Sequence, residues 1–233
     1  MKFRAGVAGL AVVVLAASAG CGAPKDGAAQ DAVGSTPTST ASASTAPTSA
    51  ASKGAAPTST TTAAESASLP SAEMQGRWWT WAATEPEATN PVADTDGSAC
   101  ARNQPDDVWF LAGTFGGRAK RACEVPGGRP VVVPVVNRVG DGRTCADFMS
   151  TARGTVVLDG EPVEPERHED DSILVEGAPG NPVTGEEGRF TATGCGLWVR
   201  LPSLAPGAHT LKVTGRSGDF STGVDYALTV VAP

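Results

Sequence analysis

The stretch DDVWFLAGTFGG, residues 106–117, decides the fold that we expect for this chain. Two acidic residues open it, a Gly-Gly pair closes it, and the apolar residues between them do not alternate with polar ones. Cys100 precedes the stretch and Cys123 follows it. A short, aromatic-rich apolar run with such bounds predicts a strand that is buried on both faces.

Further strands are predicted after this stretch. β-Branched residues, and alternation between apolar and polar positions, are typical of strands. Pro134 has no amide hydrogen to donate, so it predicts an edge or a bulge within its strand. Asp159-Gly160 predicts a tight hairpin turn. The predicted strands are Val131–Val136, Thr155–Leu158, Leu197–Leu201, His209–Val213 and Val224–Val230.

The segment Glu161–Asp171 has a different composition from its neighbours. It carries six acidic residues together with Arg167 and His168. A run of like charges of this kind is usually a solvated segment, and we predict a loop.

One helix is predicted before the β region. Met74, Trp78 and Trp81 recur at helical spacing, Ser71 is the predicted N-cap, and Glu73 suits the positive end of the helix dipole. The alternative is a strand, with Trp79 and Trp81 on the same face. Taken together, these segments predict a mainly β domain over residues 69–233: an immunoglobulin-like antiparallel sandwich with one N-terminal helix, following a disordered linker.

The N-terminus is typical of an export signal. Lys2 and Arg4 precede an apolar run, Ala5–Ala17, that is shorter than the ~20 residues a membrane-spanning helix needs. Small residues follow, up to Cys21. This resembles a bacterial lipoprotein signal, residues 1–20, in which the chain is cut before a cysteine that carries acyl chains. Ser18 stands where that family prefers Leu, and the alternative is an ordinary secretory cut after Ala19.

The cysteine count favours the lipoprotein interpretation. The chain has five cysteines, and an exported protein can pair the four distal ones and leave Cys21 over. An acylated Cys21 is not a reactive thiol, and it would attach the protein to the membrane. Among the three possible connectivities we expect two disulfides, Cys100–Cys123 and Cys145–Cys195, each closing a loop around one strand-turn unit.

The segment between Cys21 and the folded domain, residues 21–68, is almost wholly Ala, Ser, Thr, Pro and Gly. It contains no aromatic residue, so it lacks the apolar surface that would offset the entropy of ordering. We expect a disordered linker. The formal net charge of -7 argues against nucleic-acid binding, which needs clustered Lys and Arg.

Several blocks of this domain resemble a family of exported bacterial proteins that has no established activity. The resemblance rests on WWxW at residues 78–81, NPxxDxxGxxC at 90–100, VWFLAGT at 108–114, CxVPxG at 123–128 and PxxN at 134–137. The closing blocks, PGxHTL at 206–211 and YxLTV at 226–230, resemble the last strands of an immunoglobulin-like sandwich. The resemblance implies an exported protein with this fold.

The acidic block around Asn90 is the first candidate site. Asn90, Asp94 and Asp96 present side-chain oxygens ahead of Gly97, as a fragment of a calcium loop does. Position 12, counted from Asp94, is Pro105 rather than the Glu of a full calcium loop. The alternative is a chain of turns in which these side chains accept bonds from their own backbone.

Trp79 is the second candidate. If Trp78 and Trp81 face the core of a helix, Trp79 is left exposed, and its ring is then a platform for a sugar. The alternative is that the whole cluster packs in the core.

Enzymatic motifs are sparse. No catalytic Ser elbow, zinc-protease motif, phosphate loop or dinucleotide fingerprint occurs in the sequence. His209 lies in an alternating strand and is expected to be structural. A carboxylate pair such as Asp94 and Asp107 is the remaining basis for a glycan hydrolase.

These observations predict a lipid-anchored protein on the extracytoplasmic face of a cell membrane. Its domain would bind a cell-wall glycan or an envelope protein, or contribute structurally, with no cofactor and no nucleic-acid partner. The alternatives are a secreted carboxylate-dependent glycan hydrolase and a calcium-stabilised adhesion module.

Overall fold

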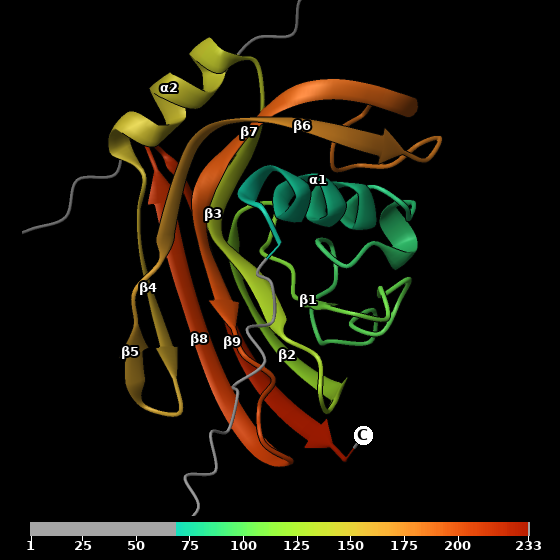
Figure 1. Ribbon diagram of the computed structural model, residues 1–233, viewed down its shortest axis with the longest axis vertical. Coiled ribbons are helices and arrows are strands. Elements are labelled where there is room, and N and C mark those ends of the chain that lie inside the picture. Colours follow the sequence, from blue (N-terminus) through green and yellow to red (C-terminus); the bar gives the residue numbers. More distant parts are fainter. Residues whose placement is uncertain (1–68, 233) are drawn as a thin grey trace, which may run out of the picture. The chain divides into compact units, whose positions relative to one another are not determined.

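The computed structural model of this protein describes residues 69–232. The predicted signal segment, Cys21 and the predicted linker lie outside the described residues. Two helices, one 3-10 turn and nine strands occur in the described part (Figure 1). They are α1 (Ser71–Ala82), η1 (Glu87–Thr89), β1 (Trp109–Phe110), β2 (Gly117–Pro126), β3 (Val131–Gly140), α2 (Gly142–Thr151), β4 (Arg153–Leu158), β5 (Glu161–Val163), β6 (Glu166–Gly177), β7 (Gly188–Leu201), β8 (Gly207–Ser217) and β9 (Phe220–Val231).

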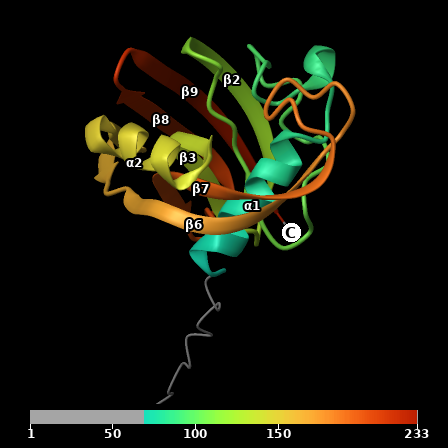
Figure 2. The ribbon, with the colours of Figure 1, turned by 90° about the horizontal axis from the view of Figure 1, so that it is seen from above.

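The strands form two sheets that pack face to face, so the predicted mainly β sandwich is confirmed (Figure 2). Sheet A has the order β1-β3-β7-β6, and sheet B has the order β2-β9-β8-β4-β5. Most neighbours are antiparallel, but β1 pairs with β3 and β2 pairs with β9 in parallel. The predicted strands after residue 130 all lie within β3, β4, β7, β8 and β9.

The stretch at residues 106–117 links the two sheets. Trp109 and Phe110 form β1 in sheet A, and the chain then crosses to β2 in sheet B. The crossing is fixed by Thr114, whose amide donates to the Thr222 hydroxyl of β9 over 3.1 Å. Val108 to Ala112 are all buried, although only two residues pair as a strand.

Sheet A is buried on both faces. Trp109 and Leu111 pack between the two sheets, whereas Phe110 and Ala112 pack on the outer face of sheet A, against α1. The predicted burial on both faces is therefore confirmed, but only Trp109 and Phe110 of the stretch form a strand. The same double burial explains why Val131–Val136 is apolar throughout, since a strand with two covered faces has no solvent side for polar residues.

Pro134 lies at a register shift between β3 and β7, so the predicted bulge is confirmed. At this bulge the sheets approach very closely: a Cβ on Gly215 of β8 would lie 2.0 Å from the carbonyl oxygen of Val135. Only glycine fits at this position.

The predicted N-terminal helix is confirmed as α1, but its predicted cap is wrong. Pro70 is the N-cap and Ser71 is the first helical residue, with no capping bond from a side chain. The helix lies against β6: Gly76 brings it so close that an added Cβ would be 2.8 Å from the carbonyl oxygen of Leu174. The Glu176 amide of β6 donates to the Thr80 hydroxyl of α1 over 3.1 Å.

The second helix, α2, was not expected from the sequence. Asp141 caps it by accepting the Thr144 amide over 2.7 Å. Its inner face places Cys145 against Cys195 of β7, and both predicted disulfides are present. The second one does not close a single strand-turn unit, because β4, β5, β6 and part of β7 lie within its 50-residue span.

The prediction of a solvated loop at Glu161–Asp171 is wrong. Residues 161–163 form β5, and residues 166–171 begin β6 after a two-residue link. The strand tolerates its acids because it lies at the edge of sheet A, where side chains reach solvent or a cation. Glu166, for example, accepts two bonds from Arg200 of β7, of 2.9 and 2.5 Å.

The predicted hairpin turn at Asp159-Gly160 is confirmed: both residues have positive φ, and β4 pairs with β5. Asp159 also binds the neighbouring strand. Its carboxylate accepts the Thr210 amide over 2.7 Å and lies 2.6 Å from Nδ1 of His209, whose Nε2 lies 2.8 Å from the carbonyl oxygen of Ala205. Both ring nitrogens thus face acceptors, so the charged imidazolium is favoured, and the predicted structural role of His209 is confirmed.

This contact predicts a pH dependence of stability. The bond to Asp159 and the Ala205 carbonyl raise the pKa of His209, and the bonds from His209 and the Thr210 amide lower the pKa of Asp159. The contribution of His209 is therefore complete below about pH 6.5 and is lost as pH rises through its raised folded-state pKa. That of Asp159 is complete above about pH 4 and is lost as pH falls through its lowered pKa. We expect the pair to add up to about 1 kcal/mol between these limits, because it is partly exposed.

The measurement is urea unfolding of the full chain and of His209→Gln at about pH 5.5 and pH 8.5. The difference in unfolding free energy should be larger at the lower pH. Asp159→Asn is the matched variant for the other partner. It removes the negative charge beside His209, while Asn tolerates positive φ and keeps an acceptor for the Thr210 amide. If the unfolding free energies of the wild type and His209→Gln differ by the same amount at both pH values, the assignment is contradicted.

Within residues 69–232, neither helix has the length and apolar character needed to cross a membrane.

Candidate functional site

The first predicted site residue, Asn90, is a structural residue. It is buried, and its amide nitrogen donates to the carbonyl oxygens of Ala82 and Glu85, each over 2.9 Å. Its side-chain oxygen accepts the Val92 amide over 2.9 Å. The side chain joins the end of α1 to the following loop, and these bonds occupy both of its polar atoms.

Asp94 and Asp96 accept bonds from nearby backbone amides. Asp94 accepts the amides of Asp96, Gly97 and Ala99 over 3.0 to 3.1 Å. Asp96 accepts the Ser98 amide over 2.9 Å, and this bond lowers the pKa of Asp96. The geometry is that of the turn alternative rather than of a calcium loop. No group of three or more His, Cys, Asp or Glu side chains in residues 69–232 is placed to hold a metal ion.

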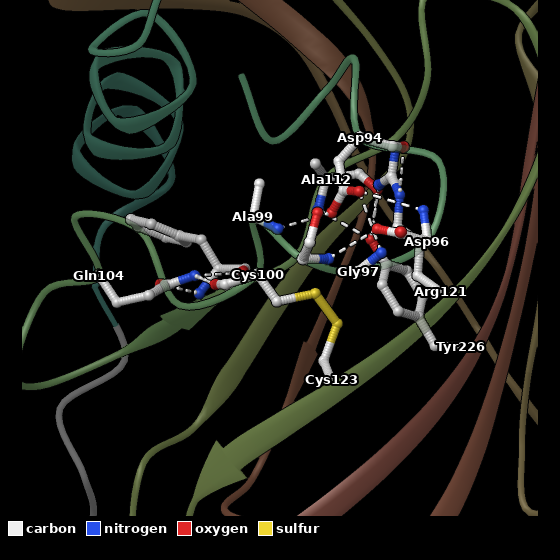
Figure 3. The surroundings of a disulfide bond; sticks show 12 residues. Asp94, Asp96, Gly97, Ala99, Cys100, Gln104, Ala112, Arg121, Cys123 and Tyr226 are labelled. Carbon is white, nitrogen blue, oxygen red and sulfur yellow. Dashed lines mark hydrogen bonds between the residues drawn. A yellow bond between two sulfur atoms is a disulfide. The ribbon is translucent and has the colours of Figure 1, made fainter. Parts of the chain in front are cut away.

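The loop that carries these acids is fastened to β2 by a buried arginine (Figure 3). Arg121 is 2% exposed, and its guanidinium donates to the carbonyl oxygens of Asp94, Ala112 and Val92 over 2.6 to 3.2 Å. It also donates to the Tyr226 hydroxyl over 2.9 Å. A buried charge needs such a set of acceptors, because an unpaired polar group in the interior is costly.

Tyr226 and a disulfide complete this Arg121 cluster, which we define as Asp94, Gly97, Arg121, Tyr226 and the Cys100–Cys123 bond (Figure 3). The Tyr226 hydroxyl donates to the Ala112 carbonyl over 2.6 Å, and burial raises the pKa of Tyr226. Gly97 has φ +102, and a Cβ there would lie 2.2 Å from the Ala122 carbonyl oxygen. Every polar contact in the cluster is internal, so we assign it a structural role.

The carboxylate pair considered for a hydrolase is not brought together around a common cavity. Asp94 belongs to the Arg121 cluster, whereas Asp107 binds Arg77 of α1 over 2.9 and 2.5 Å. That bond lowers the pKa of Asp107 and raises that of Arg77. The hollow beside Asp94 does not include Asp107 in its lining.

The prediction that Trp79 is exposed is wrong. Only 6% of its surface is exposed, so its ring is not an open platform. All three tryptophans of α1 are buried, because the helix packs on sheet A with one face and is covered by residues 83–112 on another. Trp79 is also separate from the acids: it does not line the hollow formed by Asn90, Asp94 and Asp96.

Trp79 instead lines a different hollow, of about 480 Å³, which we call the β3-edge hollow. It lies beside β3, where the short β1 has ended: β1 pairs only with Val131 and Val132, so the rest of this side of β3 has no strand partner in the described part of the chain. The lining residues are Trp78, Trp79, Val92, Gly113, Thr114, Phe115, Asn137, Arg138, Val139, Val183, Thr184 and Phe220.

Two residues that line the β3-edge hollow carry a hydrogen-bond donor without a partner. The ring Nε1 of Trp79 and the amide Nδ2 of Asn137 are both buried and have no acceptor among the described residues. Trp109 and Trp198 also carry unpartnered ring nitrogens, but neither lines this hollow. An N–H group without an acceptor costs about 1–3 kcal/mol. Both nitrogens lie below the surface of the hollow, so a ligand would reach them only if the wall opened.

Two exposed aromatic side chains also line the hollow. Phe115 is 50% exposed and Phe220 is 37% exposed, and with Leu174 they are the large apolar side chains that the described chain leaves most exposed. Phe115 lies in residues 113–117, which link β1 of sheet A to β2 of sheet B, whereas Phe220 begins β9 directly after the β8–β9 hairpin turn. The two places lie next to each other because β2 pairs with β9, with Gly117 opposite Thr222. An exposed aromatic pair beside this hollow is an arrangement suited to binding a small amphipathic group.

Sequence reasoning missed Phe115, Phe220, Asn137 and Arg138. A usable signal was present for the two phenylalanines, since Phe115 precedes Gly116-Gly117 and Phe220 comes two residues after Gly218. A large apolar side chain next to such a turn has no core to enter. No such local signal marks Asn137 or Arg138, whose role depends on where β1 ends.

In comparisons with known proteins, no family model, no curated protein and no solved structure matches this chain.

Proposed function

We propose that this protein is a surface-displayed binding module that holds a cell-wall glycan in the β3-edge hollow. Its export signal and the acyl chains on Cys21 would attach it to the extracytoplasmic face of the membrane. The linker would then let the sandwich reach the wall.

The observation that carries the proposal is the composition of the β3-edge hollow. Its volume of about 480 Å³ is in the range of small-ligand sites, about 300–1,000 Å³. A sugar ring has an apolar C–H face, which Phe115 and Phe220 can cover, and a rim of oxygens that accept hydrogen bonds. The unpartnered donors of Trp79 and Asn137 lie behind the same wall and would meet those oxygens if the wall opened.

The location that we propose supports the same class of ligand. An exported, lipid-anchored protein would meet polysaccharide as the most abundant polymer around it. The net charge of -7 disfavours binding to anionic lipid surfaces, so the wall is the better partner for the folded domain.

We therefore predict that the full chain co-sediments with purified cell-wall glycan and that Phe115→Ala/Phe220→Ala weakens this binding at least tenfold. Removing two half-exposed rings takes away apolar contact area worth about 1–3 kcal/mol, and about 1.4 kcal/mol corresponds to tenfold. The rings contribute little to the core, so the melting temperature should stay close to that of the wild type.

Leu174→Ala is the matched control. Leu174 is 52% exposed and apolar, and it does not line the β3-edge hollow. Its replacement should leave sedimentation unchanged. The proposal fails if the wild type stays in the supernatant, or if the Leu174 and Phe115/Phe220 variants bind equally well.

A further inference from the structure

The β3-edge hollow contains one feature that a neutral sugar does not use. Arg138 lines it, and the described residues give its guanidinium no ion pair. No Asp or Glu is among the lining residues. The hollow thus holds one cation with no counter-charge in its wall, in a chain whose overall charge is negative.

Arg138 is exposed and follows Asn137 directly on β3. Asn137 and Arg138 are consecutive, so their side chains leave opposite faces of the strand, yet both line the hollow. This is geometrically allowed because the hollow lies along the unpaired edge of β3 and meets both faces. A ligand at this edge would contact Asn137 on one side and Arg138 on the other.

From this arrangement we infer that the ligand of the β3-edge hollow is a sugar unit carrying a single carboxylate, held by Arg138. The inference rests on the proposed function and names its ligand class. Arg presents a planar fork of N–H donors that matches the two oxygens of a carboxylate, and such bonds are about twice as strong as neutral ones.

The number of charges favours a carboxylate over other anions. One guanidinium neutralises one negative charge, whereas a phosphate monoester carries nearly two and the hollow offers no second cation. The net negative charge of the chain also opposes binding of a densely charged polymer. A glycan in which carboxylates are borne by individual sugar units fits both constraints.

The test uses two soluble disaccharides that differ in one group: one carries a uronic acid, and the other is its carboxyl-reduced, neutral counterpart. Titration calorimetry with the full chain should give at least tenfold tighter binding for the acid. Arg138→Gln should bring this ratio to about one while leaving the affinity for the neutral sugar unchanged. Arg138→Lys keeps the charge without the fork and should retain part of the ratio.

The control variant is Lys212→Gln, which removes an exposed cation from the outer face of sheet B, away from the β3-edge hollow. It should keep the wild-type ratio. Equal affinity of the wild type for the two sugars would overturn the inference about the carboxylate while leaving the proposed function standing. So would tighter binding of a phosphorylated disaccharide, or sedimentation with cell wall without affinity for either probe. Absence of both sedimentation and probe binding would refute the proposed function itself.

Discussion

Arg121→Met should destabilise the domain by about 3–5 kcal/mol, although it replaces a charge with an apolar side chain of similar length. The guanidinium is buried and donates to three carbonyl oxygens and to the Tyr226 hydroxyl. Methionine fills part of the space but leaves the carbonyl oxygens of Asp94 and Val92 without this donor, whereas Ala112 and Tyr226 keep their bond to each other. Hydrogen bonds from a charged group contribute about 1.5–3 kcal/mol each, not additively. The loop that carries Asp94 would lose its attachment to β2.

Thermal unfolding of the full chain is the direct measurement, and a midpoint lower by about 10 °C or more is expected. Arg118→Met is the matched control, because Arg118 lies on the same strand and is exposed. It should shift the midpoint by no more than about 2 °C, as surface substitutions usually do. Equal midpoints for the two variants would show that the Arg121 contacts contribute nothing net.

Replacing both Cys145 and Cys195 with Ala should cost about 4 kcal/mol. The bond spans 50 residues, and the chain-entropy account of disulfides gives about this value for a loop of that length. Both cysteines are fully buried, and their bond holds α2 against β7 across the end of the sandwich. Without it, the segment containing β4, β5 and β6 gains freedom in the unfolded chain only, so the folded state should keep its structure.

The comparison variant is Cys100→Ala/Cys123→Ala, whose bond spans 23 residues. It should cost about 3.5 kcal/mol by the same account. Unfolding in denaturant, with and without a reductant, measures both. Reductant should lower the unfolding free energy of the wild type below that of either double variant without reductant. A loss below about 1 kcal/mol for the Cys145/Cys195 variant would contradict the assignment of this bond as a main stabiliser.

The parts of the fold that were predictable were those with a local pattern. Alternation located β8 and β9, the Pro134 bulge followed from a missing amide hydrogen, and the Asp159-Gly160 turn followed from the backbone freedom of its residues. The two disulfides were predicted correctly, although the reason given for Cys145–Cys195 was wrong.

The failures share a physical cause. The charges of Glu161–Asp171, counted alone, predict a loop. In the structure most of the segment begins an edge strand, where its side chains reach solvent and Glu166 accepts a bond from Arg200. In β2 the alternation is broken by Arg121, a charged residue at a buried position, so the strand gave no clear signal. In both places, contacts with distant parts of the chain allow a charged residue in a strand that the local composition alone does not predict.

The candidate site was less predictable than the fold. Trp79 does line the β3-edge hollow, but through a buried ring rather than an exposed one. Asn90, Asp94 and Asp96 have the chemistry of a binding site, and their geometry uses that chemistry to order a loop. The hollow itself exists because β1 is only two residues long, a length that no pattern within the stretch at residues 106–117 specifies.

The close approach of α1 to β6 has a consequence for how these molecules behave at high density. The last strand of an open sheet presents free amide and carbonyl groups, and another polypeptide can add to it and begin a chain of such additions. Here Gly76 and Thr80 set the helix over that row of groups, in front of Leu174 and Glu176. Many copies at high concentration would therefore not join through β6, and a bulky side chain at Gly76 should expose this edge to such pairing.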